Sequence, residues 1–277
     1  MSQEVLVWGI GLPALCCAAI LLVVLRPWQG AAGGAAGWAA ANALAAGFVV
    51  SYLVVRDWEI DLPPKRPWEW LAYLVVLVAI VLGYGLSAGG RGKSAWTGWI
   101  FASGLCAYLI VGTRVDQFWA WRIVTAAMMV ASMSSLDRLR EQSNSGLFPF
   151  SIGLVAVAAC LVLLEGRQDT LAQMAGALAA CLGVIAIMGW WQSSITLGGG
   201  GVLVVGMLLP GLAMSGYFAG TKLPAWCFIL AALAPAAYWI TELPGAPSFV
   251  TQKPMEYGLG AVVATSAAAV AAAMYVS

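Results

Sequence analysis

A polar stripe in an apolar stretch is the strongest sign of chemistry in the sequence. Arg122, Thr125, Met129 and Ser132 fall within an arc of about 80° if residues 117–136 form a helix. An arginine inside a membrane is costly unless it pairs, faces water or reaches the lipid headgroups. The stripe could line the path of a solute, or Arg122 could pair or snorkel to the headgroups beside Asp116. We favour pairing or snorkelling for Arg122.

A run of glycines marks a second candidate region. Gly198, Gly199, Gly200 and Gly201 stand in 52 residues without a charge, and Pro210 follows them. Four consecutive glycines are poor helix formers, so we expect the turn between two spans there. The following span, 202–221, is then the best candidate for an interrupted helix, the kind of element that builds solute sites in transporters. A kinked packing helix is the alternative and is favoured.

Small residues recur every four positions between residues 31 and 55, at Gly33, Gly37, Ala41 and Ala45. Such a face lets two helix backbones approach closely, in the same chain, in a homo-oligomer or with a membrane-protein partner. Asn42 lies in the same span. We expect its amide to bond to a neighbouring helix, as a packing contact and not as a ligand for a solute.

The segment 56–69 carries seven of the 25 charged residues. Asp57, Glu59 and Asp61 alternate as calcium ligands do, but Leu62 replaces the required glycine and Trp68 the final glutamate, which excludes an EF-hand. An internally paired, solvated connector is the favoured interpretation, and a partner or ion site is the alternative.

Signatures of catalysis and cofactor binding are weak or missing. The chain has no histidine, which removes imidazole bases, the usual zinc sites and histidine-ligated haem. The run from Ser87 to Ser94 resembles a phosphate-binding loop, but a serine replaces its first glycine and an apolar span precedes it. The six cysteines form no CxxC spacing. We therefore predict no enzyme activity, no metal and no cofactor.

The composition predicts an all-α, polytopic membrane protein. Hydrophobic residues make up 62% of the 277 residues and charged residues only 9%, far from the composition of soluble domains. The formal net charge of +1 argues against nucleic-acid binding, so the lipid bilayer is the expected environment.

Charge-free intervals of about 20 residues then predict the spans. We expect nine or ten membrane-spanning helices in one domain, without a soluble domain; residues 117–136 are the doubtful segment. Lysines and arginines divide almost evenly between the two sets of loops, so no orientation follows. The predicted spans are 5–25, 31–55, 70–90, 94–113, 117–136, 147–164, 170–191, 202–221, 224–241 and 257–277.

Two stretches carry a resemblance to a known family. The first combines Arg26-Pro27-Trp28 with Leu62-Pro63-Pro64 and the run from Trp68 to Tyr73; the second combines residues 170–183 with 211–218 and Leu233-Ala-Pro235. Together they resemble an uncharacterised family of polytopic membrane proteins from planctomycete-type bacteria. The resemblance covers about half of the chain and implies a bacterial inner-membrane location. It implies no activity, because that family has none assigned.

Three functional hypotheses follow from these patterns. The first is a permease-like protein for a small neutral or zwitterionic solute, based on the span count, the glycine run and the Arg122 stripe. The second is a non-catalytic membrane subunit or scaffold, based on the small-residue faces. A lipid-modifying enzyme that uses the four charges between Asp137 and Glu141 is a much weaker third hypothesis, because such a cluster is ordinary for a solvated loop.

Overall fold

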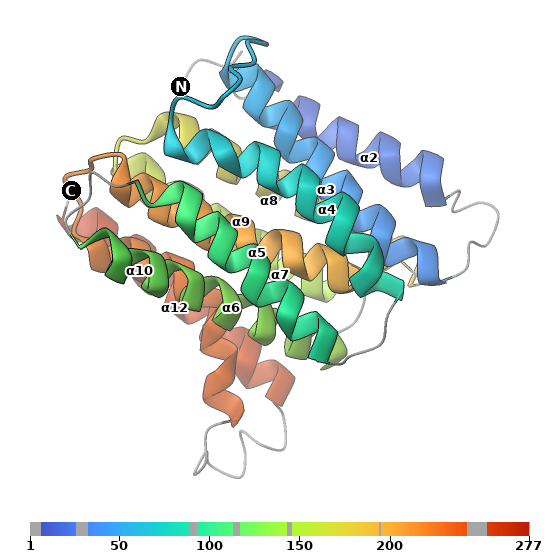
Figure 1. The fold of residues 1–277 in the computed structure, drawn as a ribbon. Helices are drawn as coiled ribbons and strands as arrows, with labels where there is room; N and C mark the ends of the chain where they lie inside the picture. Colours follow the sequence, from blue (N-terminus) through green and yellow to red (C-terminus); the bar gives the residue numbers. More distant parts are fainter. Residues whose placement is uncertain are drawn as a thin grey trace.

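The computed structural model describes residues 7–25, 33–88, 93–112, 117–142, 146–193, 195–242 and 254–276. Every regular element in these ranges is a helix, as the composition predicted (Figure 1). The helices are η1 (Val7–Gly11), α2 (Leu12–Leu25), α3 (Gly33–Val55), η3 (Pro67–Glu69), α4 (Trp70–Ala88), α5 (Lys93–Ile110), α6 (Phe118–Gln142), α7 (Leu147–Glu165), α8 (Asp169–Trp191), α9 (Gly198–Phe218), α10 (Ala225–Leu233), η4 (Ala234–Glu242) and α12 (Pro254–Val276).

Six of these stretches are long and apolar enough to cross a membrane: Val7–Leu25, Trp38–Val55, Leu147–Glu165, Asp169–Trp191, Gly198–Phe218 and Met255–Val276. Three shorter apolar helices cover Pro67–Val81, Trp96–Ile110 and Ala225–Thr241. The helix α6 belongs to neither group, in line with the doubt about residues 117–136. Many large apolar side chains remain exposed on the outer helices, among them Ile80, Ile100, Ile123 and Ile187. Such an exposed apolar surface fits a lipid environment.

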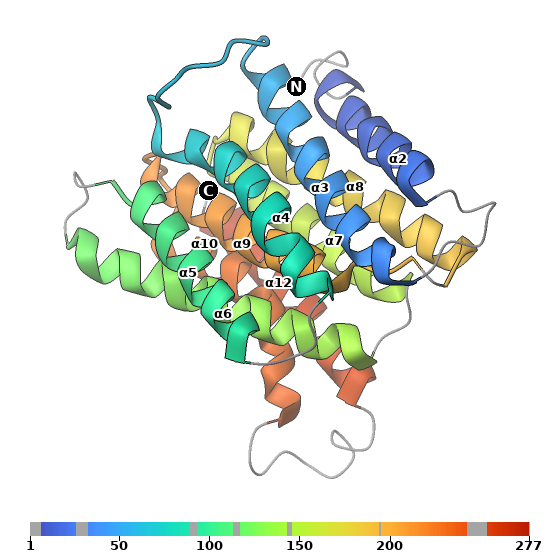
Figure 2. The ribbon, with the colours of Figure 1, turned by 45° about the vertical axis from the view of Figure 1, so that its right-hand side comes forward.

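The helix α9 forms the centre of the bundle. It contacts α3, α4, α6 and α10, and its side chains are almost all buried. Figure 1 and Figure 2 both show α3, α4 and α5 side by side across it. The C-termini of α3, α5 and α9 meet the N-termini of α4, α6 and α10 at one end of the bundle. We call this the polar end, because most of the charged contacts described below lie there.

The structure contradicts the expected turn at the four glycines. The helix α9 begins at Gly198, and Gly201 already donates its backbone N–H to the Leu197 carbonyl at 3.1 Å. Gly198 has a φ of +60°, a conformation that suits glycine, so the chain turns before this residue and not after it. Buried backbone groups need hydrogen bonds, and a helix supplies them even where its residues are weak helix formers.

The interrupted helix is also not the one that the glycines indicated. The helix α9 continues through Pro210 to Phe218. The chain changes instead from α-helix to 3₁₀-helix between α10 and η4, at Leu233 and Ala234. Pro235 directly follows, and a proline provides no backbone N–H to a helix. The break therefore lies within the predicted span 224–241.

Asn42 and the small-residue face serve packing within the chain. The Asn42 amide nitrogen donates to the Trp38 carbonyl of its own helix at 2.9 Å. The expected bond to a neighbouring helix stays a prediction. Ala41 and Ala45 are buried. That part of the face packs inside the bundle, where α3 contacts α2, α4 and α9.

Candidate functional site

The polar stripe of α6 faces the interior of the bundle. Thr125, Met129 and Ser132 have no exposed surface, and Arg122 is only 9% exposed. The helical period therefore predicted their common face correctly. Their neighbours differ along the helix, however, because α6 contacts α5, α9 and η4 in turn.

Arg122 binds the end of α5. Its Nε and Nη2 atoms both donate to the Val111 carbonyl, each at 3.2 Å, one residue beyond the last residue of α5. Its guanidinium carbon lies 4.2 Å from the ring centre of Tyr108. A cation is favourable at the C-terminus of a helix, where carbonyls lack helical partners, and an aromatic face adds to the attraction. Arg122 is thus paired, with a carbonyl as acceptor; Asp116 lies outside the described residues.

Two serines of α6 donate hydrogen bonds to backbone carbonyls at the break between α10 and η4. The Ser132 hydroxyl donates to the Ala232 carbonyl at 3.1 Å, and the Ser135 hydroxyl donates to the Pro235 carbonyl. In a 3₁₀ pattern the Ala232 carbonyl would accept from residue 235, which is a proline without N–H. Ser132 therefore supplies a donor that the broken helix lacks.

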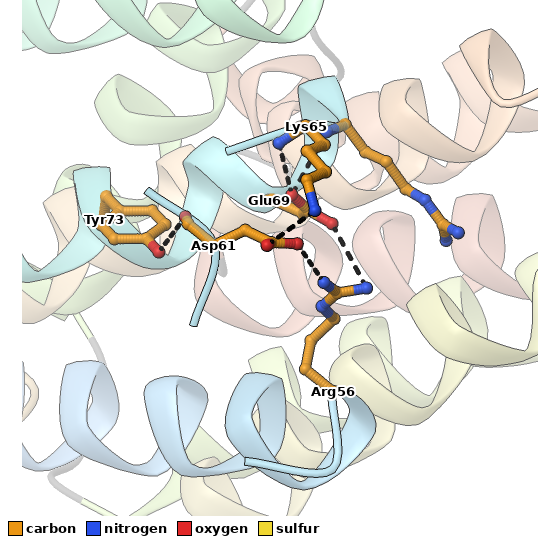
Figure 3. A network of polar contacts seen from close by, with 6 residues as sticks. Arg56, Asp61, Lys65, Glu69 and Tyr73 are labelled. Carbon is orange, nitrogen blue, oxygen red and sulfur yellow. Dashed lines mark hydrogen bonds and ion pairs between the residues drawn. The ribbon is translucent and has the colours of Figure 1, made fainter. Parts of the chain in front are cut away.

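A network of charged residues closes the polar end near α3 and α4 (Figure 3). Arg56 pairs with Asp61 and approaches Glu69, whose Oε1 atom is 3.8 Å from Nη1 of Arg56. The Lys65 ammonium lies 2.8 Å from the Asp61 carboxylate, and the Tyr73 hydroxyl donates to the Asp61 carbonyl at 3.0 Å. The connector is internally paired, as expected.

Glu69 is the buried member of this network, with no exposed surface. Its Oε2 atom accepts the backbone N–H groups of Lys65 at 2.8 Å and Arg66 at 3.2 Å. Pro67 occupies the first position of η3 and Glu69 the third, which is the arrangement of a capping box. A carboxylate at a helix N-terminus accepts hydrogen bonds from free N–H groups, and its negative charge interacts favourably with the helix dipole. Glu69 therefore fixes the start of α4.

The pKa of Asp61 lies below its usual range because Lys65 donates a hydrogen bond to it and the Lys65 and Arg56 charges favour the carboxylate. A carboxyl group whose pKa is lower in the folded state than in the unfolded state stabilises the fold at pH values above its unfolded pKa, which is about 3.9 for aspartate. This stabilisation is lost as the pH falls toward and through the folded-state pKa. We expect the unfolding midpoint of the wild type to fall more steeply below about pH 4 than that of Asp61→Asn. Thermal unfolding across pH measures this difference, and parallel acid limbs would contradict it.

The remaining predicted positions do not join the stripe. The glycine run lies at the end of α9 opposite the polar end and comprises Gly198, Gly199, Gly200 and Gly201. The amide of Asn42 donates a hydrogen bond within its own helix, α3. Pro210 is buried in α9, next to Gly211, where a Cβ would lie 3.4 Å from Cε of Met129. Among the predicted site residues, the structure thus brings Pro210 close to the stripe but neither Asn42 nor the glycine run.

A groove of about 410 Å³ lies between η1, α7 and α8, away from the stripe. Ile10, Gly153, Cys160 and Gly176 contribute to its lining, which is almost entirely apolar. It offers hydrocarbon contact but few groups that could orient a polar solute.

Sequence reasoning missed two residues at these sites: Glu69 and Ser135. The pattern Arg66-Pro67-Trp68-Glu69 could have revealed Glu69, because proline at the first and glutamate at the third helical position indicate a capped helix start. Ser135 needed knowledge of where the neighbouring helix breaks.

Neither a search of the described residues for metal sites nor the comparisons with known proteins indicate an activity. In the part of the chain that the structure describes, no group of three histidine, cysteine, aspartate or glutamate residues could hold a metal ion. No family model matches the sequence, and no curated protein matches it significantly. The resemblance to planctomycete-type membrane proteins therefore stays a prediction.

Proposed function

We propose that the chain is an integral membrane protein of the bacterial inner membrane with nine or ten spans. The six long apolar helices and the three shorter ones support nine, and α6 would be the tenth. Arg122 would not prevent α6 from crossing, because its Nε and Nη2 atoms donate to the Val111 carbonyl and its guanidinium lies over the Tyr108 ring. The inner-membrane location follows from the family resemblance alone.

Within the membrane, we propose a permease-like function for a small neutral or zwitterionic solute. The observation that carries this proposal is the break between α10 and η4. Broken helices expose backbone carbonyls inside a membrane only where protein or a solute path covers them, and transporters build their solute sites from such elements. Here the carbonyls of Ala232 and Pro235 meet the hydroxyls of Ser132 and Ser135.

The chemistry of this region favours an uncharged or internally neutral solute. The polar groups at the break are two hydroxyls and two carbonyls, which can exchange hydrogen bonds with amide, hydroxyl or zwitterionic groups. Neither pair carries a charge that could offset the desolvation of an ion. The carboxylate of Glu69 is engaged as a helix cap at the polar end.

Thr125, Met129 and Ser132 have no exposed surface in the described structure. Passage of a solute would require α10 and η4 to separate from α6. The two serine hydrogen bonds would then break and leave four polar groups for the solute. Ser132 and Ser135 are thus the residues whose loss should change the opening of the path.

Solute uptake by proteoliposomes tests the proposal, with glycerol, urea and glycine betaine as probes and light scattering as the readout. We expect at least one probe to enter faster than in protein-free liposomes. The double variant Ser132→Ala/Ser135→Ala should change that rate several-fold. Ser151→Ala is the matched control, since the Ser151 hydroxyl donates only within α7, to the Leu147 carbonyl at 2.8 Å.

Equal uptake with and without the protein for all three probes would contradict the permease proposal. The second candidate, a non-catalytic membrane subunit or scaffold, is favoured by the same buried interior, because a purely structural bundle needs no solute path. Mass determination after mild detergent extraction tests it. A lone monomer would count against a subunit or a homo-oligomer.

A further inference from the structure

The side chains of Arg56 and Glu69 face one another at the polar end without a direct hydrogen bond (Figure 3). The Oε1 atom of Glu69 lies 3.8 Å from Nη1 of Arg56, which is an ion-pair distance but too long for a hydrogen bond. Glu69 uses its other oxygen, Oε2, for two backbone N–H groups of the connector, and Arg56 uses Nη2 for Asp61. Oε1 of Glu69 and Nε of Arg56 are both buried, and neither forms a hydrogen bond within the described ranges. A buried acceptor and a buried donor thus remain on two side chains that are in contact.

The hydroxyl of Tyr52 is a third polar atom near this pair. Arg56 lies one turn beyond Tyr52, and its backbone N–H donates to the Tyr52 carbonyl at 3.1 Å. Side chains on a helix lean toward its N-terminus, so the Arg56 side chain starts over the turn that carries Tyr52. The Tyr52 ring also contacts Trp68, the chain neighbour of Glu69, with ring centres 6.1 Å apart and edge to face. The charges of Glu69 and Arg56 both act on the Tyr52 hydroxyl.

This hydroxyl is buried and lacks a partner as well. Tyr52 is only 2% exposed, and its oxygen forms no hydrogen bond in the part of the chain that the structure describes. Tyr73, whose ring centre is 6.2 Å from that of Tyr52, donates its own hydroxyl to the Asp61 carbonyl. Unsatisfied polar atoms are rare in protein interiors, and where several gather, ordered water usually satisfies them.

We propose that Tyr52, Arg56 and Glu69 together hold a buried water molecule between the end of α3 and η3. Water can accept the N–H of Arg56 Nε and donate to Oε1 of Glu69, while it exchanges a third hydrogen bond with the Tyr52 hydroxyl. Three protein partners are typical of a buried water. The opposite charges of Arg56 and Glu69 offset each other, so the site favours a neutral molecule over an ion of either sign. This water site does not depend on a permease function, because a structural bundle would need it equally.

Thermal unfolding of purified Tyr52→Phe tests the site, because this change removes the hydroxyl and keeps the ring contacts with Trp68 and Tyr73. We expect the unfolding midpoint to fall by about 2–4 °C, since the water loses one of its partners. Tyr275→Phe is the matched control: Tyr275 is 93% exposed, so the loss of its hydroxyl should leave the midpoint unchanged. A Tyr52→Phe midpoint at or above that of the wild type would overturn the proposal, because removing a dry, unsatisfied hydroxyl costs no stability.

X-ray radiolysis of the wild-type protein distinguishes water from a protein partner of the Tyr52 hydroxyl. The X-rays split bound water in place, and the resulting hydroxyl radicals oxidise the aromatic side chains beside it. Tyr238 in η4 is the matched control, since it is a tyrosine without exposed surface. We expect Tyr52 to be oxidised several-fold faster than Tyr238, as measured by mass spectrometry of the digested protein. Equal rates would overturn the proposal even if Tyr52→Phe is destabilising, because the hydroxyl would then have a partner other than water.

Discussion

Replacement of Gly206 by leucine should lower the free energy of unfolding by about 3 kcal/mol. A Cβ at this position would lie 2.6 Å from Cγ of Met133 and 3.2 Å from its backbone nitrogen. Met133 could move its side chain, but its backbone belongs to α6 and can only move with the helix. The central helix α9 and α6 would therefore separate. Reversible unfolding in mixed micelles measures the loss.

Gly104→Leu is the matched control for this substitution. Gly104 lies inside α5, as Gly206 lies inside α9, but no atom comes within 4 Å of a Cβ built there. The control should unfold within about 0.5 kcal/mol of the wild type. Similar losses in both variants would show that the helix interior, and not the contact with Met133, requires a glycine.

Glu69→Ala should cost about 2–4 kcal/mol. The change removes the acceptor of the Lys65 and Arg66 N–H groups and one of the two carboxylates near Arg56. Because Glu69 is fully buried, water cannot easily replace it. We expect the start of α4 to fray, which faster hydrogen exchange of the backbone between residues 65 and 72 would reveal.

Glu59→Ala serves as the control, since Glu59 lies in the same connector but is exposed. Its effect should stay within about 0.5 kcal/mol. Equal effects of the two substitutions would mean that net charge at this end, and not the helix cap, stabilises the bundle.

Composition and charge spacing predicted the helical fold because hydrocarbon leaves the backbone few choices. An apolar stretch must satisfy its own N–H and C=O groups, and a helix is the usual solution. The expected helices therefore correspond to observed ones, including α6 despite Arg122, except that the span 224–241 divides into α10 and η4. The same constraint explains why the turn expected at residues 198–201 is wrong. The low helix propensity of glycine mattered less than the need of buried backbone groups for hydrogen-bond partners.

The partners of polar side chains could not be predicted from the sequence. Periodicity placed Thr125 and Ser132 on one face of a helix, but the acceptor of Ser132 lies 100 residues away, at a break that depends on Pro235. Pro235 and Pro210 look alike in sequence, since both lie within apolar spans. Only the packing around them decides that α9 continues through its proline while α10 gives way to a 3₁₀-helix.

In the proposed membrane arrangement, the hydrogen bonds between Arg122 and Val111 bear on how α5 and α6 would be inserted. The helix α6 is not among those apolar enough to cross a membrane unaided. Because Arg122 donates two hydrogen bonds to the Val111 carbonyl at the end of α5, the two helices could insert together as a hairpin that keeps this contact. Translocation of α6 would then depend on α5, and synthesis of α6 without its preceding helix would leave it on the membrane surface.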